Sequence, residues 1–73
     1  MDTAEIERMI KQAIPGAQVQ ARTDDGHHYN ASVIAEQFRG LSRVQQHQMV
    51  YKALKEKIGG ELHALALQTN APD

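Results

Sequence analysis

The residues best suited to chemistry in this 73-residue chain are four histidines: His27, His28, His47 and His63. A neutral imidazole can bind a transition metal or exchange a proton near neutral pH. No two of these histidines have the spacing of a helical metalloprotease motif, and no carboxylate stands where such a motif needs one. The pattern therefore favours separate metal ligands or packing residues over a hydrolytic site.

Each histidine also has a structural interpretation. His47 falls on the apolar stripe of a predicted helix, which is typical of a half-buried packing residue with one hydrogen bond. His63 interrupts an apolar segment, so both a hydrogen-bonded structural role and a functional role stay open. His27 and His28 follow the turn-forming pair Asp24-Asp25, and they are either solvated loop residues or metal ligands.

Composition excludes several classes of function. The absence of cysteine rules out disulfides, a CxxC redox motif, a thiolate nucleophile and cysteine-bound zinc. With 8 basic and 9 acidic residues, the net charge of −1 gives no overall attraction to nucleic acid or anionic lipid. We expect one domain over residues 1–73, too small for an independent enzyme. With no apolar run long enough for a membrane span or signal peptide, we expect a cytoplasmic protein without a membrane segment.

The first predicted element is a helix that Asp2 or Thr3 caps and that ends near Ala13, because Pro15 disfavours helical geometry before it. Its apolar stripe recurs at intervals of three and four residues: Ile6, Met9, Ile10 and Ala13. Its exposed face is expected to carry the polar residues between them: Glu7, Arg8, Lys11 and Gln12.

The apolar period then changes to two. Alternation from Ala17 to Arg22 and from Tyr29 to about Ala35 predicts two half-buried strands. The sequence Asp24-Asp25-Gly26 between them is typical of a tight turn, with Gly26 at positive φ. Strands joined by so short a turn must pair antiparallel.

The second half predicts a helix and a third strand. Ser42-x-x-Gln45 is a capping box that opens the longest helix, which Gly59-Gly60 is expected to close. Its buried stripe is predicted at Val44, Tyr51, Leu54 and Ile58, flanked by Val50 and Ala53. The apolar segment from Glu61 to Thr69 is predicted to be a strand parallel to the second.

The predicted fold is therefore α+β in the order αββαβ. Both helices pack on one face of a three-stranded mixed sheet, and the opposite face is comparatively open. The two edges of such a sheet need protection, which leaves a homodimer open as a further state.

Three segments, in the order in which they occur, resemble the BolA-like proteins. They are Gly26-His27-His28-Tyr29, residues 38–51 (FRGLSRVQQHQMVY) and residues 62–67 (LHALAL). The resemblance spans residues 4–72 and implies an αββαβ fold similar to class II KH domains. It also implies a monothiol glutaredoxin as partner and a 2Fe–2S cluster shared with that protein and its glutathione. The isolated chain is expected to carry no cofactor, and its role would lie in iron–sulfur cluster trafficking or iron regulation.

The resemblance also implies which residues ligate the cluster. The late-strand ligand is His63. For the loop ligand, a cysteine of some members falls at Asp25, and His27 is the first choice to replace it. His28 is the substitute, because it matches the family's ordinary histidine at the start of the second strand. A chain without cysteine can only complete a cluster site that another protein offers.

Two further surfaces are expected. The partner-binding surface is predicted at Phe38, Gly40, Arg43 and His47. The alternative function that the family implies is transcription regulation, with DNA contacts from Arg39, Arg43, Lys52 and Lys55. DNA binding ranks second, because the chain has no Gly-x-x-Gly loop and its net charge is −1. A third function is a glutaredoxin-binding module that holds no metal.

Overall fold

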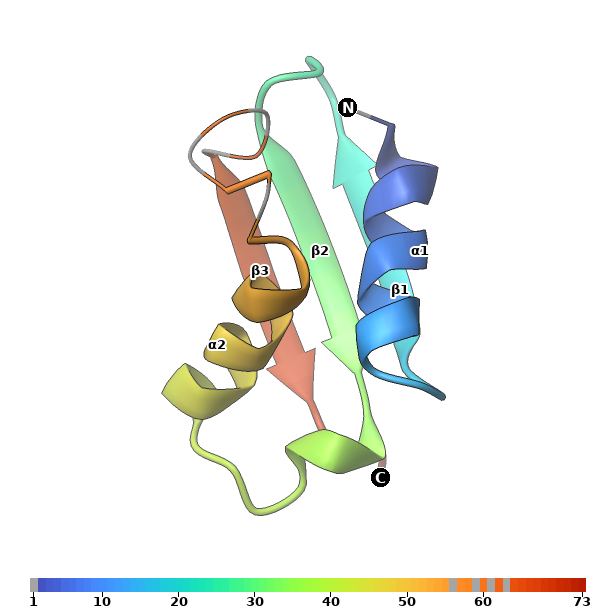
Figure 1. Ribbon diagram of the computed structural model, residues 1–73, viewed down its shortest axis with the longest axis vertical. Coiled ribbons are helices and arrows are strands. Elements are labelled where there is room, and N and C mark those ends of the chain that lie inside the picture. The colour runs from blue at the N-terminus through green and yellow to red at the C-terminus, as the bar shows by residue number, and fades with distance from the viewer. Residues whose placement is uncertain (1, 56, 59, 61, 63) are drawn as a thin grey trace.

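The computed structural model describes residues 2–55, 57–58, 60, 62 and 64–73. Its elements follow in the order α1 (Thr3–Ala13), β1 (Gln18–Thr23), β2 (Tyr29–Ile34), the short 3-10 helix η1 (Glu36–Phe38), α2 (Arg43–Ala53) and β3 (Leu65–Asn70) (Figure 1). This order confirms the predicted αββαβ fold. Within the described residues, no helix has the length and apolar character that crossing a membrane requires.

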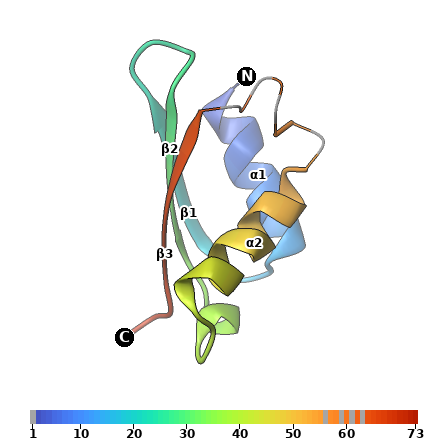
Figure 2. The same cartoon turned by 90° about the vertical axis from the view of Figure 1, so that its left-hand side faces the viewer.

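The three strands form one mixed sheet in the order β1-β2-β3. β1 and β2 pair antiparallel, with Val19 opposite Val33, and β2 and β3 pair parallel, with Ala31 opposite Leu67. Figure 2 shows both helices on one face of this sheet and the other face bare, as predicted. The short β1–β2 turn enforces the antiparallel pair, and the crossover through α2 allows the parallel one.

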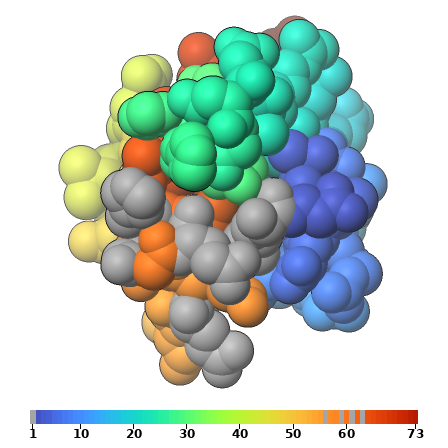
Figure 3. Space-filling model, turned by 90° about the horizontal axis from the view of Figure 1, so that it is seen from above, coloured from blue at the N-terminus to red at the C-terminus, as the bar shows by residue number. Residues whose placement is uncertain are grey.

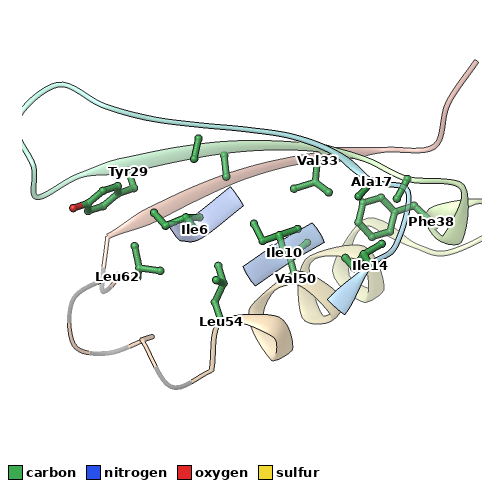
Figure 4. Close-up of a cluster of buried hydrophobic side chains, with 13 residues drawn as sticks. Ile6, Ile10, Ile14, Ala17, Tyr29, Val33, Phe38, Val50, Leu54 and Leu62 are labelled. Atoms are coloured by element: carbon green, nitrogen blue, oxygen red, sulfur yellow. The ribbon is translucent and has the colours of Figure 1, made fainter. Parts of the chain in front are cut away.

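The hydrophobic core lies between the two helices and the sheet (Figure 4). Ile6 and Ile10 of α1 and Ile14, which follows the helix, are no more than 1% exposed, because their spacing of four residues places them on one side of the chain. Phe38 of η1 is completely buried. The core is therefore mostly aliphatic, as the scarcity of aromatic residues predicts.

The first helix has the predicted ends. The Asp2 carboxylate accepts a hydrogen bond from the Ala4 backbone N–H at 3.0 Å, and the chain leaves the helix at Ile14, before Pro15. One expectation about its exposed face was wrong. Glu7 is half-buried, because its Oε2 atom accepts a hydrogen bond from the backbone N–H of Ala21 in β1 at 2.9 Å.

The second helix is shorter than predicted. Ser42 and Gln45 form the expected capping box, but α2 ends at Ala53, and Gly59 lies outside the described residues. Leu54 leaves helical geometry, with φ −110° and ψ 14°. Its side chain is completely buried, and the chain turns there because Leu54 packs into the core.

The buried face of α2 also differs from the prediction. Val50 and Leu54 are buried, whereas Val44 is 67% exposed and Tyr51 and Ile58 are more than a third exposed. The reason is a polar residue that faces inward. Gln46 donates from Nε2 to the carbonyls of Phe38 and Leu41, at 3.3 and 3.0 Å, and its Oε1 accepts from Thr69 Oγ1 at 2.7 Å. These bonds fix the rotation of the helix, and Val44 is left in solvent.

The third strand runs from Leu65 to Asn70, four residues later than its predicted start at Glu61. Glu61 and His63 lie outside the described residues. Thr69 is buried, because its hydroxyl group donates to Gln46 beneath the sheet.

Candidate functional site

The β1–β2 loop, residues 24–28, is organised by one carboxylate. Asp25 Oδ1 accepts hydrogen bonds from the backbone N–H groups of His27 and His28, at 2.8 and 2.9 Å, and Oδ2 lies 2.8 Å from Nδ1 of the His28 ring. Gly26 has φ +77°, the left-handed conformation predicted for this turn. Asp25 therefore fixes both the backbone of the loop and one of its imidazoles.

The loop is also anchored to the strands that flank it. Thr23 Oγ1 donates to the His28 carbonyl at 2.8 Å and accepts from the Gly26 N–H at 2.9 Å. The Tyr29 hydroxyl donates to the Gly26 carbonyl at 3.0 Å, and the rest of Tyr29 is buried in the core. These bonds hold the loop in one conformation over the end of the sheet.

Hydrogen bonding lowers the pKa of Asp25 far below the ordinary value of a carboxyl group. The largest cause is the backbone N–H of His28, followed by the His28 ring and then the backbone N–H of His27. The carboxylate is therefore ionised at neutral pH and can only accept hydrogen bonds. The Nδ1 atom of His28 is then the donor to Oδ2, and Nε2 is the ring nitrogen left for a ligand, on a side chain that is 76% exposed.

His27 and His28 differ in this respect. Both are exposed, as predicted. The loop holds the backbone N–H of His27, but no residue that the structure describes holds the His27 ring. Of the two imidazoles, only that of His28 has a fixed tautomer and a fixed direction.

This loop lies next to the start of β3. The Tyr29 backbone N–H donates to the Ala64 carbonyl at 2.8 Å, and Tyr29 pairs with Leu65. Figure 3 views the molecule from this end and shows the green atoms of the loop beside orange and red atoms of the described residues around the start of β3. His63 is the sequence neighbour of Ala64 and lies outside the described residues.

The described side chains do not form a metal site by themselves. Among the described residues, no three side chains of the types His, Asp and Glu converge to hold a metal ion. Both oxygens of Asp25 already accept hydrogen bonds, so the loop offers the imidazole nitrogens of His27 and His28 and the exposed carboxylate of Asp24 as its free donors. A metal bound at this loop would need further ligands from outside the described residues.

The predicted partner-binding residues do not gather around this loop. Phe38 is wholly buried in the core, so its side chain offers no surface to a partner in this structure. Gly40 takes φ +82° in the turn before α2, and Arg43 is exposed at the start of that helix. Figure 1 places this turn at the opposite end of the molecule from the β1–β2 loop, along an axis of 33 Å.

His47, the remaining histidine, lies on α2. It is half-buried, as predicted, and its ring meets Tyr51 edge-on, with ring centroids 6.4 Å apart. Its buried Nε2 atom has no hydrogen-bond partner among the described residues, in contrast to the single bond expected from the sequence. In the described part of the chain, the His47 ring therefore packs against Tyr51 and its Nε2 atom is unpaired.

Of the cations predicted to contact DNA, one is held by hydrogen bonds and the others are exposed to solvent. Arg39 is engaged: its guanidinium donates to both oxygens of Glu36, at 2.7 and 3.0 Å, and to the Pro72 carbonyl at 2.7 Å. Lys52 is exposed on α2, and Lys55 is exposed in the turn that follows it. Together with Arg43, the structure leaves three of the four predicted cations available.

Lys52 and Lys55 line a shallow surface depression of about 710 Å³ on α2. Its apolar lining comes from Met49, Tyr51 and Ile58. Sequence reasoning missed this feature, because it placed Tyr51 and Ile58 in the core.

Known proteins similar to this chain have one family in common. The profile of a family described as "BolA-like protein" matches residues 3–73. Human BolA-like protein 1 is 32% identical over 94% of this chain and 57% of its own length, and chloroplastic protein BOLA1 of Arabidopsis thaliana is 34% identical over 92% and 42%. The chain thus spans about half the length of these relatives. The solved structure of a bolA homologue from Coxiella burnetii is 34% identical, with a TM-score of 0.86 over 100% of this chain and 94% of that one.

Proposed function

This chain belongs to the BolA-like protein family, and on that premise we propose that it is a non-enzymatic adaptor for a monothiol glutaredoxin. In this proposal the two proteins share a 2Fe–2S cluster. The glutaredoxin and its bound glutathione supply thiolates, and this chain, which has no cysteine, supplies imidazoles. The adaptor acts in cytoplasmic iron–sulfur cluster trafficking or iron regulation.

The observation that carries the proposal is the hydrogen bond between the Tyr29 N–H and the Ala64 carbonyl, 2.8 Å long. It joins the residue that follows His28 to the residue that follows His63 in the sequence. The loop that carries His28 therefore adjoins Ala64, the described residue next to His63 in the sequence, which supports the assignment of both segments to one site.

The contacts of the loop favour His28 over His27 as the second ligand. A metal-binding histidine commonly donates its other ring N–H to a carboxylate, which fixes the tautomer and the ring direction. His28 has this arrangement with Asp25, at 2.8 Å, and His27 does not. Asp25 is then a positioning residue, and the order of preference expected from the sequence is reversed.

The chemistry of the proposed site follows from its donor atoms. When bound, a 2Fe–2S cluster supplies one-electron chemistry and labile iron and sulfide, and imidazole ligation raises its reduction potential relative to an all-thiolate site. This chain contributes the positioning of its ligand. Thr23, Asp25 and Tyr29 hold the loop, so that the Nε2 lone pair of His28 is available without rearrangement.

A DNA-binding function receives less support. The Arg39 guanidinium already makes three hydrogen bonds, so a phosphate contact would have to replace bonds to Glu36 and Pro72. The net charge of −1 also gives little of the long-range attraction on which such binding depends.

The test of the adaptor function is visible circular dichroism. We would mix the purified chain with a glutathione-loaded monothiol glutaredoxin and a source of iron and sulfide. We expect a spectrum different from that of the glutaredoxin alone. His63→Ala and His28→Ala should remove this difference, and the matched control His27→Ala should keep it.

A second measurement separates ligation from protein binding. Far-ultraviolet circular dichroism checks that each variant is folded, and calorimetry measures its affinity for the cluster-free glutaredoxin. Loss of the visible signal in a folded variant that still binds the partner supports the ligand assignment. A spectrum that His63→Ala leaves unchanged would overturn it, and a wild-type mixture with no new spectrum would overturn cluster sharing altogether.

A further inference from the structure

The two edges of the sheet expose different amounts of unpaired backbone. In β1, the residues Gln18, Gln20 and Arg22 direct their backbone N–H and C=O groups toward β2. The backbone groups of Ala21, between two of them, therefore point away from the sheet. The Ala21 N–H does not remain free, because Glu7 of α1 accepts its hydrogen bond at 2.9 Å. The helix therefore closes the middle of the β1 edge.

At the opposite edge, the direction of each backbone group follows from the parallel register. The N–H of Tyr29 bonds to the carbonyl of Ala64, and the N–H of Ala35 bonds to that of Asn70. The direction of the backbone groups alternates along a strand. Between these two bonds, Ala66 and Gln68 therefore direct their N–H and C=O groups toward β2. The residues with outward-pointing N–H and C=O groups are then Leu65, Leu67 and Thr69.

No residue that the structure describes covers these outward groups. The hydrogen bond of Thr69 to Gln46 uses its side chain, beneath the sheet, and leaves its backbone free. Figure 2 views the molecule from the β3 side and shows α2 beside the strand, on one face of the sheet, with no described element across its edge. Natural proteins commonly protect such an edge with a charge or a proline, and β3 contains neither.

We propose that the β3 edge is the docking surface for a second copy of this chain. The two β3 strands pair antiparallel about a two-fold axis through Leu67, and the two sheets join into one of six strands. Leu67 then lies opposite its own counterpart, and Leu65 lies opposite the partner's Thr69. All the outward backbone groups of these three residues find partners in this register.

The side chains of β3 fit a copy of themselves. On the bare face of the sheet, Ala66 is placed opposite Gln68 of the second copy, so a small side chain meets a long one. No like charges oppose each other, because β3 is uncharged along its whole length. On the helix side, the half-buried Leu67 gains its own counterpart as an apolar neighbour, and Leu65 lies diagonal to that counterpart. An isologous contact of this kind needs no other surface to close.

The expected association is weak and depends on concentration. One strand pair buries much less surface than the roughly 1,200–2,000 Å² of a stable interface. We therefore expect monomers in dilute solution and dimers in concentrated solution.

Analytical ultracentrifugation over a concentration series tests the proposal. The apparent mass should rise from that of one chain, 8.1 kDa, toward twice that value. Hydrogen exchange followed by NMR then shows which residues form the interface. The amides of Leu65, Leu67 and Thr69 should exchange rapidly in dilute protein and become protected on concentration, whereas those of Ala66 and Gln68 should be protected throughout.

Charge variants on the bare face test the register without touching the core. The double variant Ala66→Lys with Gln68→Lys places two ammonium groups opposite each other on each side of the axis and should abolish the rise in mass. The matched double variant Ala66→Glu with Gln68→Lys places opposite charges there and should restore or strengthen it. The control Gln20→Lys, on the same face of β1, should leave the association unchanged.

Each outcome decides the proposal. A mass that stays at one chain at every concentration would overturn it, and so would association that the double lysine variant leaves intact. Pairing of β3 with a strand of another protein, and not with itself, would equally overturn it. The test needs neither glutaredoxin nor iron. A negative result for self-association is therefore distinguishable from a failure of the proposed adaptor function.

Discussion

The two edge strands of the sheet are each tied to a helix by a side chain, but the two ties use different parts of the strand. Glu7 of α1 accepts a bond from the backbone of β1 at Ala21, whereas Gln46 of α2 accepts a bond from the side chain of Thr69 in β3. The first tie consumes a backbone donor at the sheet edge. The second leaves the backbone free, so similar helix–strand packing closes the middle of one edge and leaves the other open.

The same contrast holds for the two helices, which are 11 residues long each. The apolar side of α1 packs into the core, where Ile6 and Ile10 are completely buried. In α2, Val44 and Tyr51 remain exposed, because the polar Gln46 takes an inward position. The α1–β1 half of the molecule is therefore mainly structural, and the α2–β3 half keeps surface for contacts.

The largest effect is expected from the core of the α1–β1 half. Ile10→Ala should lower the free energy of unfolding by about 2–5 kcal/mol, because it leaves a cavity at a side chain with no exposed surface. The control Val44→Ala, an exposed apolar residue of α2, should change it by less than about 0.5 kcal/mol. Urea unfolding measures both values. Similar losses for the two variants would contradict the division of roles.

A smaller effect should follow from cutting the two ties. Glu7→Ala and Thr69→Val should each cost about 1 kcal/mol in urea unfolding, the usual net value of a hydrogen bond. The two variants should differ in self-association. Glu7→Ala frees the Ala21 N–H and should add a second open edge. Thr69→Val alters no backbone N–H or C=O group at a sheet edge. Ultracentrifugation should therefore show species larger than a dimer for the first variant alone. Glu7→Gln, which keeps an acceptor, should behave like the wild type.

The smallest effect is expected where the chain leaves β3. Arg39 ties η1 to the Pro72 carbonyl, and its hydrogen bonds to Glu36 lower the pKa of that carboxyl below the ordinary value of 4.5. Because the pKa is lower in the folded protein, the stabilising effect of the pair is complete above that ordinary value. It is lost as the pH falls through the lowered pKa.

An NMR titration of the Glu36 carboxyl checks this prediction. Its midpoint should lie below the ordinary value in the wild type and return toward that value in Arg39→Gln. A midpoint that Arg39→Gln does not move would show that the pair does not persist in solution.

Local signals in the sequence predicted much of the fold. The spacing of Ile6 and Ile10, the capping box at Ser42 and the turn at Gly26 each depend on neighbouring residues, and the structure has all three as expected. The alternation of the first two strands and the length of the crossover were enough for the sheet topology. For the site, the exposure of His27 and His28 could be predicted, because both stand in a turn.

The errors concern residues whose surroundings come from distant parts of the chain. Ending α2 at Leu54 depends on core packing that no local pattern reports. The same holds for Phe38: the resemblance of residues 38–51 to the BolA-like proteins suggested a contact residue, and the fold buries its side chain completely. The family assignment of His63 stays a prediction, because this residue lies outside the described part of the chain.

By itself, the sequence determined the order of the elements and the absence of thiolate chemistry, because helix stripes, strand alternation and residue types are properties of short segments. Only the tertiary structure decided which polar side chains turn inward and which backbone groups stay unpaired. Glu7 meets Ala21 across 14 positions of the chain, and Gln46 meets Thr69 across 23. Contacts over such distances depend on how the helices rotate on the sheet, and this rotation is fixed only when the whole core packs.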